Sequence, residues 1–178
     1  MLLSSSRRPS RLRAPPDIDS ESDFMANITM SDRIEAPPER VFDLFTDLHE
    51  APNRLRGVEQ IELLTEGPIG KGTRWRETRI MMKRECTETL EITEFDPPST
   101  FTAVCDSHGS VWTSEFRFTP DGAGTRIDLS MRCRPETLCA RLMSPMSFLF
   151  AGALRKAIQQ DIDDLRTAAT EAGQTAPA

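Results

Sequence analysis

The sequence predicts an α+β fold, in which a seven-stranded antiparallel sheet packs against one long C-terminal helix and two short helices follow the first strand. One observation is that residues 58–133 form extended segments separated by turn signals, and short connections join antiparallel neighbours. The other is that residues 144–169 repeat apolar side chains at helical spacing. This helix of roughly 25 residues would be about 38 Å long, enough to cross a whole sheet.

The first strand and the first short helix follow one another directly. The strand begins at Ala26, and its apolar residues recur at period two. Pro37 and Pro38 suit the first turn of a helix, where a backbone N–H has no partner, and Glu39 complements the helix dipole. Pro52 ends the short helical region. The predicted apolar face consists of Val41, Leu44, Phe45 and Leu48.

The middle of the chain is expected to form six more strands in a meander, whose apolar face the C-terminal helix covers. The strands are predicted at 58–66, 73–82, 85–95, 100–106, 111–118 and 125–133. Ser144 and Pro145 suit the N-cap and first position of the helix. Its spacing places polar residues, among them Arg155, Asp161 and Asp164, on the solvent side.

Composition and charge exclude several classes of partner. The formal net charge of -6 repels a phosphate backbone, so no nucleic acid is expected. No apolar run approaches the roughly 18 residues of a membrane span, so no stable membrane insertion is expected. The four cysteines are widely spaced and there are two histidines, which predicts no metal site, no cofactor, and reduced thiols in a cytoplasmic protein.

We expect one folded domain, at residues 25–171, between disordered tails at 1–24 and 172–178. The first tail is rich in Ser, Pro and Arg and has no apolar period. A transit peptide is a weaker interpretation, because the apolar helical face of such a peptide is missing. Translation from Met25 is a third interpretation, and the sequence does not decide between Met1 and Met25 as the native start.

The order of these elements resembles the helix-grip fold of the START-like (SRPBCC) superfamily, particularly its polyketide cyclase/dehydrase and lipid-transport branch. The resemblance covers about residues 26–171 and rests on segments in the right order: IEAPPERVFDLFTD, VEQIELL, GPIGKGTRWR, EITEFDPPSTF, FRFTPDGAGTRIDLSM and DIDDLRTAATE. It implies a sheet curled around the long helix, with an elongated apolar cavity between them. It implies no catalytic motif, because this superfamily shares a shape rather than a chemistry.

Strand parity then selects the side chains that would line such a cavity, because every second residue faces the helix. In strand 73–82 the choice between Trp75 with Glu77 and Arg74 with Arg76 stays open. For each residue taken alone, filling the core is the favoured interpretation, and it is the set taken together, rich in aromatic residues and methionine, that favours a cavity. The candidate lining residues are Trp75, Leu90, Ile92, Phe101, Ala103, Trp112, Ser114, Phe116, Leu129, Met131, Met146, Leu149, Phe150 and Ala153.

Three functions remain open from the sequence. The first is binding of a hydrophobic small molecule (a lipid, a polyketide or an aromatic metabolite) as a carrier or sensor. The second is a polyketide cyclase, aromatase or dehydratase, in which Glu77 or Glu88 moves a proton and catalysis comes mainly from positioning. The third is a protein-interaction module without a ligand, and a homodimer is left open. His108 is expected at an exposed hairpin tip, poorly placed for a general base.

Overall fold

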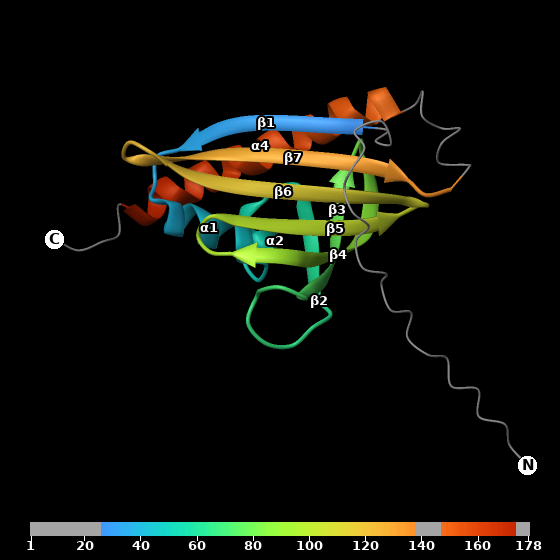
Figure 1. Cartoon of the computed structure of the whole chain (residues 1–178), viewed down its shortest axis with the longest axis horizontal. Helices are drawn as coiled ribbons and strands as arrows, with labels where there is room; N and C mark the ends of the chain where they lie inside the picture. The colour runs from blue at the N-terminus through green and yellow to red at the C-terminus, as the bar shows by residue number, and fades with distance from the viewer. Residues whose placement is uncertain (1–25, 138–146, 174–178) are drawn as a thin grey trace, which may run out of the picture.

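The computed structural model describes residues 26–137 and 147–173, which form one curved sheet and three helices (Figure 1). The predicted tails lie outside these residues, except that 172 and 173 belong to the last helix. Ser144 and Pro145 also lie outside the described residues. The strands are β1 (Ala26–Ile34), β2 (Val58–Leu63), β3 (Arg74–Met81), β4 (Arg84–Asp96), β5 (Thr100–Ser107), β6 (Ser110–Asp121) and β7 (Gly124–Pro135). The helices are α1 (Pro38–Thr46), α2 (Ala51–Arg54) and α4 (Ser147–Gly173).

The sheet is an antiparallel meander with the strand order β1-β7-β6-β5-β4-β3-β2. Strands β2 to β7 pair in the order of the sequence, and β1 closes the edge beside β7, where Ile28 lies opposite Met131. A bulge in β4 shifts the register after Ile92, so that Phe95 rather than Glu94 lies opposite Phe101. The predicted seven-stranded antiparallel sheet is therefore confirmed.

Helix α4 covers one face of the sheet, and we call this the concave face (Figure 1). Its buried residues recur at helical spacing and pack against β7, α1 and the central strands. This confirms the long C-terminal helix and its role as a cover. The buried residues of α4 are Ile158, Ile162, Leu165 and Ala169.

Helix α1 is wedged between α4 and strands β6 and β7. Pro37 is its N-cap and Pro38 its first residue, as the sequence predicts. The predicted apolar face omitted Phe42, but this side chain is buried too, because α1 is covered on two sides. The ring of Phe42 meets three other rings edge-on, those of Phe95, Phe101 and Phe118, at centroid distances of 5.2, 6.0 and 5.5 Å.

Candidate functional site

Strand β3 brings the first polar side chains to the concave face. Trp75 is buried in the core, and strand alternation places Glu77 and Arg79 on the same side as Trp75. Arg74 and Arg76 point to the opposite, outer face and are exposed. Of the two parities that the sequence left open, the structure therefore has Trp75 with Glu77 inside.

Glu77, Arg79 and Asp161 of α4 form a cluster, which we call the guanidinium cluster. Arg79 donates from Nε to Glu77 and from Nη2 to Asp161 Oδ2, the latter at 2.6 Å. The Trp75 Nε1–H donates to Glu77 Oε2 at 3.1 Å. The side chains of Arg79 and Asp161 are only 22% and 15% exposed. Burial alone would lower the pKa of Arg79, but the two carboxylates outweigh it and raise that pKa.

The prediction that Asp161 and Asp164 lie on the solvent side of the helix is wrong. Asp161 meets Arg79, and Asp164 accepts hydrogen bonds from the backbone N–H and the Nε of Arg56, at 2.9 and 2.8 Å. Burial raises the pKa of Asp161 although Arg79 opposes this. Its second oxygen, Oδ1, is buried and has no hydrogen-bond partner within residues 26–137 and 147–173. The buried cation of Arg79 explains why an acidic residue occupies this inner position.

Glu88, the second predicted acid, lies directly opposite Glu77 in the β3–β4 register. Ser107 Oγ donates to Glu88 Oε1 at 2.6 Å and lies 2.7 Å from His108 Nδ1. His108 is 92% exposed at the β5–β6 turn, as predicted, but this contact also connects it to Glu88. The Cys105 thiol lies 3.7 Å from Glu88 Oε2. Burial and then the charge of Glu88 raise the pKa of Cys105 to about 12.

The predicted lining residues divide into two groups along the concave face. One row of the register joins Phe101, Phe116 and Leu129, and the next row joins Ala103, Ser114 and Met131. Met146 and the side chains of Leu149 and Phe150 lie outside the described residues. The buried group is Trp75, Ile92, Phe101, Ala103 and Leu129, and the half-buried group is Leu90, Trp112, Ser114, Phe116, Met131 and Ala153.

The α1 end of the concave face is filled by aromatic packing. The rings of Phe101 and Phe116 are stacked at 4.6 Å, and Phe45 packs against Phe116 and Phe118 at 5.7 and 5.2 Å. For Phe101 and its neighbours, the core interpretation therefore describes the structure. Further from α1, Ala103 and Cys133 are buried, but several other inward-facing side chains remain half-buried. We call this part the half-open region, and it consists of Leu90, Cys105, Trp112, Ser114 and Met131.

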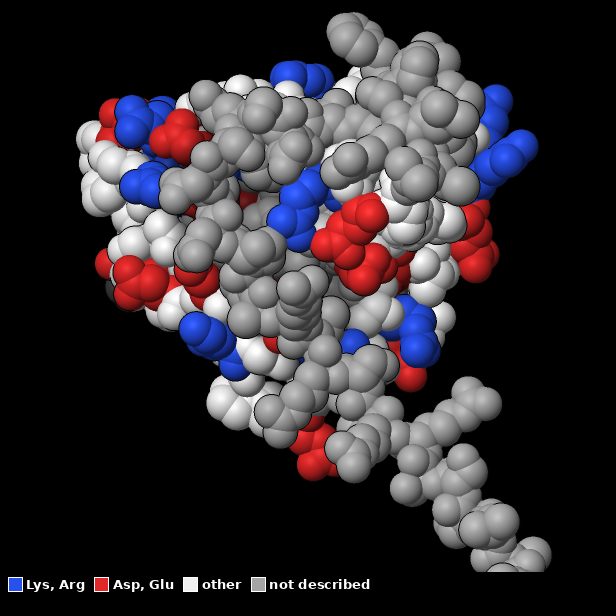
Figure 2. Space-filling model, turned by 45° about the vertical axis from the view of Figure 1, so that its right-hand side comes forward, with Lys and Arg blue, Asp and Glu red and all other residues white. Residues whose placement is uncertain are grey.

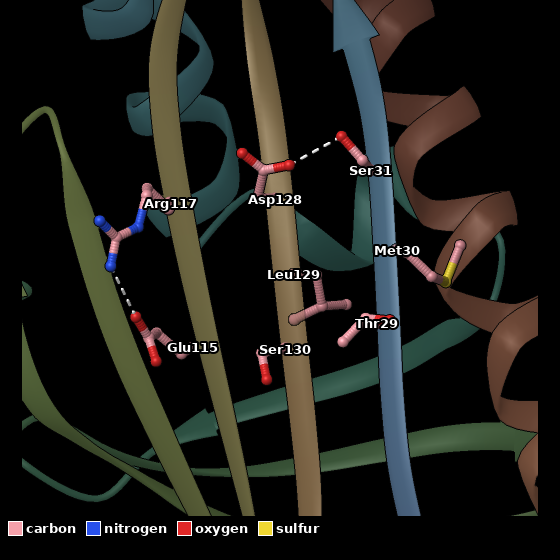
Figure 3. A pocket seen from close by; sticks show the side chains of 8 residues that line it. All are labelled: Thr29, Met30, Ser31, Glu115, Arg117, Asp128, Leu129 and Ser130. Carbon is pink, nitrogen blue, oxygen red and sulfur yellow. Dashed lines mark hydrogen bonds and ion pairs between the residues drawn. The ribbon is translucent and has the colours of Figure 1, made fainter.

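Two hollows elsewhere differ from the predicted cavity in place and character. One, of about 300 Å³, lies on the outer face over β1, β7 and β6 (Figure 3). It is lined by paired polar groups, in which Arg117 donates to Glu115 at 3.1 Å and Ser31 to Asp128 at 2.7 Å. The other, of about 290 Å³, lies between α1, α2 and Ile69. The cavity between sheet and α4 stays a prediction.

The described residues carry charges of both signs at the surface. Figure 2 shows acidic and basic side chains interspersed on the described part of the face that it presents. Within the described residues, His, Cys, Asp and Glu form no group of three that could hold a metal ion. No helix in the same residues is both long enough and apolar enough to span a membrane.

A curved sheet gripping one long helix, with a polar cluster on its concave face, defines a protein of the helix-grip class. The chain belongs to the family described as polyketide cyclase / dehydrase and lipid transport, whose sequence model matches residues 25–170. This confirms the resemblance to the START-like superfamily. A comparison with curated protein sequences gives no significant match.

Solved structures with the same fold include proteins of different activities. TTHA0849 from Thermus thermophilus is 21% identical at a TM-score of 0.69, over 83% of this chain and 99% of that chain. The Zhui aromatase/cyclase from Streptomyces sp. R1128 is 16% identical at 0.65, over 82% and 93%. Norcoclaurine synthase from Thalictrum flavum, in complex with a transition state analogue, is 14% identical at 0.61, over 83% and 96%. At these identities the likeness shows the fold alone.

Proposed function

We propose that this protein binds a hydrophobic small molecule (a lipid, a polyketide or an aromatic metabolite) in the half-open region beneath α4, as a carrier or sensor. One observation carries the proposal: inward-facing side chains such as Leu90, Trp112 and Met131 are only half-buried, with Leu90 and Met131 at the margins of the core clusters, whereas Phe101 and Leu129 on the same face are buried. Ligand sites are concave and mostly apolar, with a few convergent polar groups. Glu88 and the guanidinium cluster supply such groups at the edge of this region.

Two similar structures support a small-molecule function for this fold. The Zhui protein is an aromatase/cyclase, and norcoclaurine synthase was solved with a transition state analogue. The proposal includes a cytoplasmic location, in keeping with the free thiols of Cys86, Cys105 and Cys133.

Native mass spectrometry tests the proposal on the protein as purified, before and after extraction with organic solvent. We expect a co-purified apolar molecule that extraction removes. A bulky substitution then tests the place of binding. Ser114→Trp should fill the half-open region and abolish binding of a neutral fluorescent probe, N-phenyl-1-naphthylamine.

The matched control is Thr113→Trp, one residue away on β6 and pointing to the outer face. It should leave probe binding unchanged. An empty protein that binds no probe would contradict the proposal and favour a protein-interaction module. Equal loss of binding in both variants would contradict the assigned place.

A second candidate function, a cyclase or dehydratase, is favoured by the Glu77–Glu88 pair. The two carboxyl groups come from residues directly opposite in the register, and Glu88 reaches the exposed His108 through Ser107, a route for a proton to solvent. Glu88→Gln should abolish turnover of a polyketide substrate while its binding persists. Turnover that survives in both Glu77→Gln and Glu88→Gln would exclude this chemistry.

A further inference from the structure

We infer that the half-open region selects its ligand by charge: it accepts an apolar molecule whose polar end is a cationic or uncharged hydrogen-bond donor, and it discriminates against carboxylates. This inference rests on the proposed function and names the ligand class for the same region. It separates long-chain amines and alcohols from fatty acids of equal length.

Among residues 26–137 and 147–173, the ionisable groups beside the half-open region are predominantly acidic. Glu77, Glu88 and Asp161 provide three carboxyl groups against the single guanidinium of Arg79, which leaves a formal charge of -2. Arg79 already pairs with two of these carboxylates, so its single positive charge is shared between them and does not offset the acidic excess that an incoming anion meets.

The next cation on the same face of this hairpin is too distant to compensate. Arg84 shares the inward parity of Glu88 on β4, but it is exposed at the hairpin end, four residues away. Four residues of extended strand span about 13 Å. Arg84 is also exposed to solvent, which weakens its interaction with Glu88 relative to that of the part-buried acidic groups.

Glu88 is the acid best placed to receive a donor from the ligand. Its side chain is 35% exposed, and Oε1 accepts a hydrogen bond from Ser107. Oε2 has the weak Cys105 thiol donor at 3.7 Å. An ammonium or hydroxyl group entering from the half-open region can donate to this oxygen, whereas a carboxylate would face it without a shared proton.

The pKa of the Cys105 thiol, inside the half-open region, is affected by the same acidic groups. Burial is the main reason that its pKa is raised, and the charges of Glu88, Asp106 and Glu77 each raise it further. Burial disfavours a charge of either sign, but the charges of Glu88 and Glu77 disfavour an anion in particular, whether it is this thiolate or a bound carboxylate.

The test uses three ligands with one apolar chain: decylamine, decanol and decanoate, each competing with N-phenyl-1-naphthylamine for the intact protein at pH 8. We expect decylamine to bind at least about ten-fold more tightly than decanoate, with decanol between them, because the same acidic groups attract the ammonium and repel the carboxylate, so that the two charge effects add. Added salt should reduce the difference.

Glu88→Gln removes the proposed acceptor charge and should reduce the preference for decylamine several-fold while decanol binding changes little. Glu91→Gln is the matched control, because it makes the same charge change on the same strand but on the outer face, where Glu91 pairs with Arg74. It should leave the order and the ratio intact. His108→Gln removes the imidazole that lies 3.8 Å from Glu88 Oε1 and should also preserve the order.

The outcomes separate the inference from the function on which it rests. Charge selection is overturned if decanoate binds as tightly as decylamine, or if Glu88→Gln and Glu91→Gln change the ratio of the two affinities equally. Binding of a hydrophobic molecule would stand in either case. If neither the probe nor any of the three ligands binds, the proposed function itself fails.

Discussion

Arg79→Met is the substitution that tests the guanidinium cluster most directly, because one side chain holds two carboxylates at the junction of β3 and α4. Methionine keeps the unbranched apolar stem of the side chain and removes the terminal guanidinium with its charge and its donors. Glu77 and Asp161 would then face each other without a cation in a largely buried position.

The expected cost follows from burial. Removing one partner of a buried ion pair destabilises proteins by about 3–5 kcal/mol, and the remaining exposure of these side chains favours the lower end, about 3 kcal/mol. Arg76→Met is the control on the same strand. Arg76 is 47% exposed and pairs with Glu62 on the outer face, so its loss should cost under about 1 kcal/mol.

The cost of Arg79→Met should also depend on pH, with a sign fixed by Asp161. Its folded-state pKa is already raised by burial, and losing Arg79 removes the main opposing influence. A carboxyl group whose folded pKa exceeds its unfolded pKa destabilises the fold as pH rises through that interval, because the folded state must then release a proton it retains. The destabilisation should therefore be larger at pH 8 than at pH 5, by about 1.4 kcal/mol for each unit of additional pKa shift.

Urea unfolding of the wild type and both variants at the two pH values measures these differences. Combining Arg79→Met with Asp161→Leu should recover part of the loss, since the uncompensated charge is removed as well. The reasoning is refuted if Arg79→Met costs no more than Arg76→Met, or if its deficit grows on acidification.

Three further predictions concern other parts of the concave side. In a variant whose other cysteines are replaced, the rate of alkylation of the Cys105 thiol should rise with pH up to at least about pH 10 without a plateau, because the pKa of this thiol is raised to about 12. Glu88→Gln should lower the midpoint of this pH dependence. Phe42→Ala should lower the free energy of unfolding by about 3–5 kcal/mol in a urea titration, and Phe42→Leu by clearly less. Burial opposes ionisation of Asp32, but hydrogen bonds, first that of Gln159, lower its pKa. Asp32→Asn should therefore destabilise at pH 7, and its cost should disappear as pH falls below the ordinary aspartate range.

Most of the fold could be predicted because each helix and strand has a recognisable pattern of apolar and polar residues over a short stretch of the sequence. The period-two apolar residues of β1 and the helical spacing from Ile158 to Ala169 each identify one buried face without knowledge of any partner. The paired prolines before α1 fix where that helix begins. Short connections then leave few ways to order the strands.

The polar residues of the candidate site were harder to predict from the sequence, because the polarity of their neighbours does not show which of them face the inside. In TRWRETR both parities carry charged residues, so local polarity does not decide that Arg79 lies inside. Asp161 has acidic neighbours on α4 and looks solvent-facing from its spacing, yet it is buried by an arginine 82 residues away. A charge whose partner is distant in sequence leaves no periodic signal.

The concave face has a packed end and a half-open region, and strand alternation alone does not predict to which of the two an inward-facing side chain belongs. Phe101 and Met131 satisfy the same alternation rule in their strands, and both were predicted to line a cavity. Phe101 is buried because α1 inserts Phe42 above it, whereas Met131 lies beyond the reach of these rings and stays half-buried. Alternation says which way a side chain points, but the element that covers it decides whether it fills a core or faces a ligand. The best sequence signal for that distinction is α1 itself, because its additional buried ring, Phe42, lies at the end of the sheet that aromatic side chains fill.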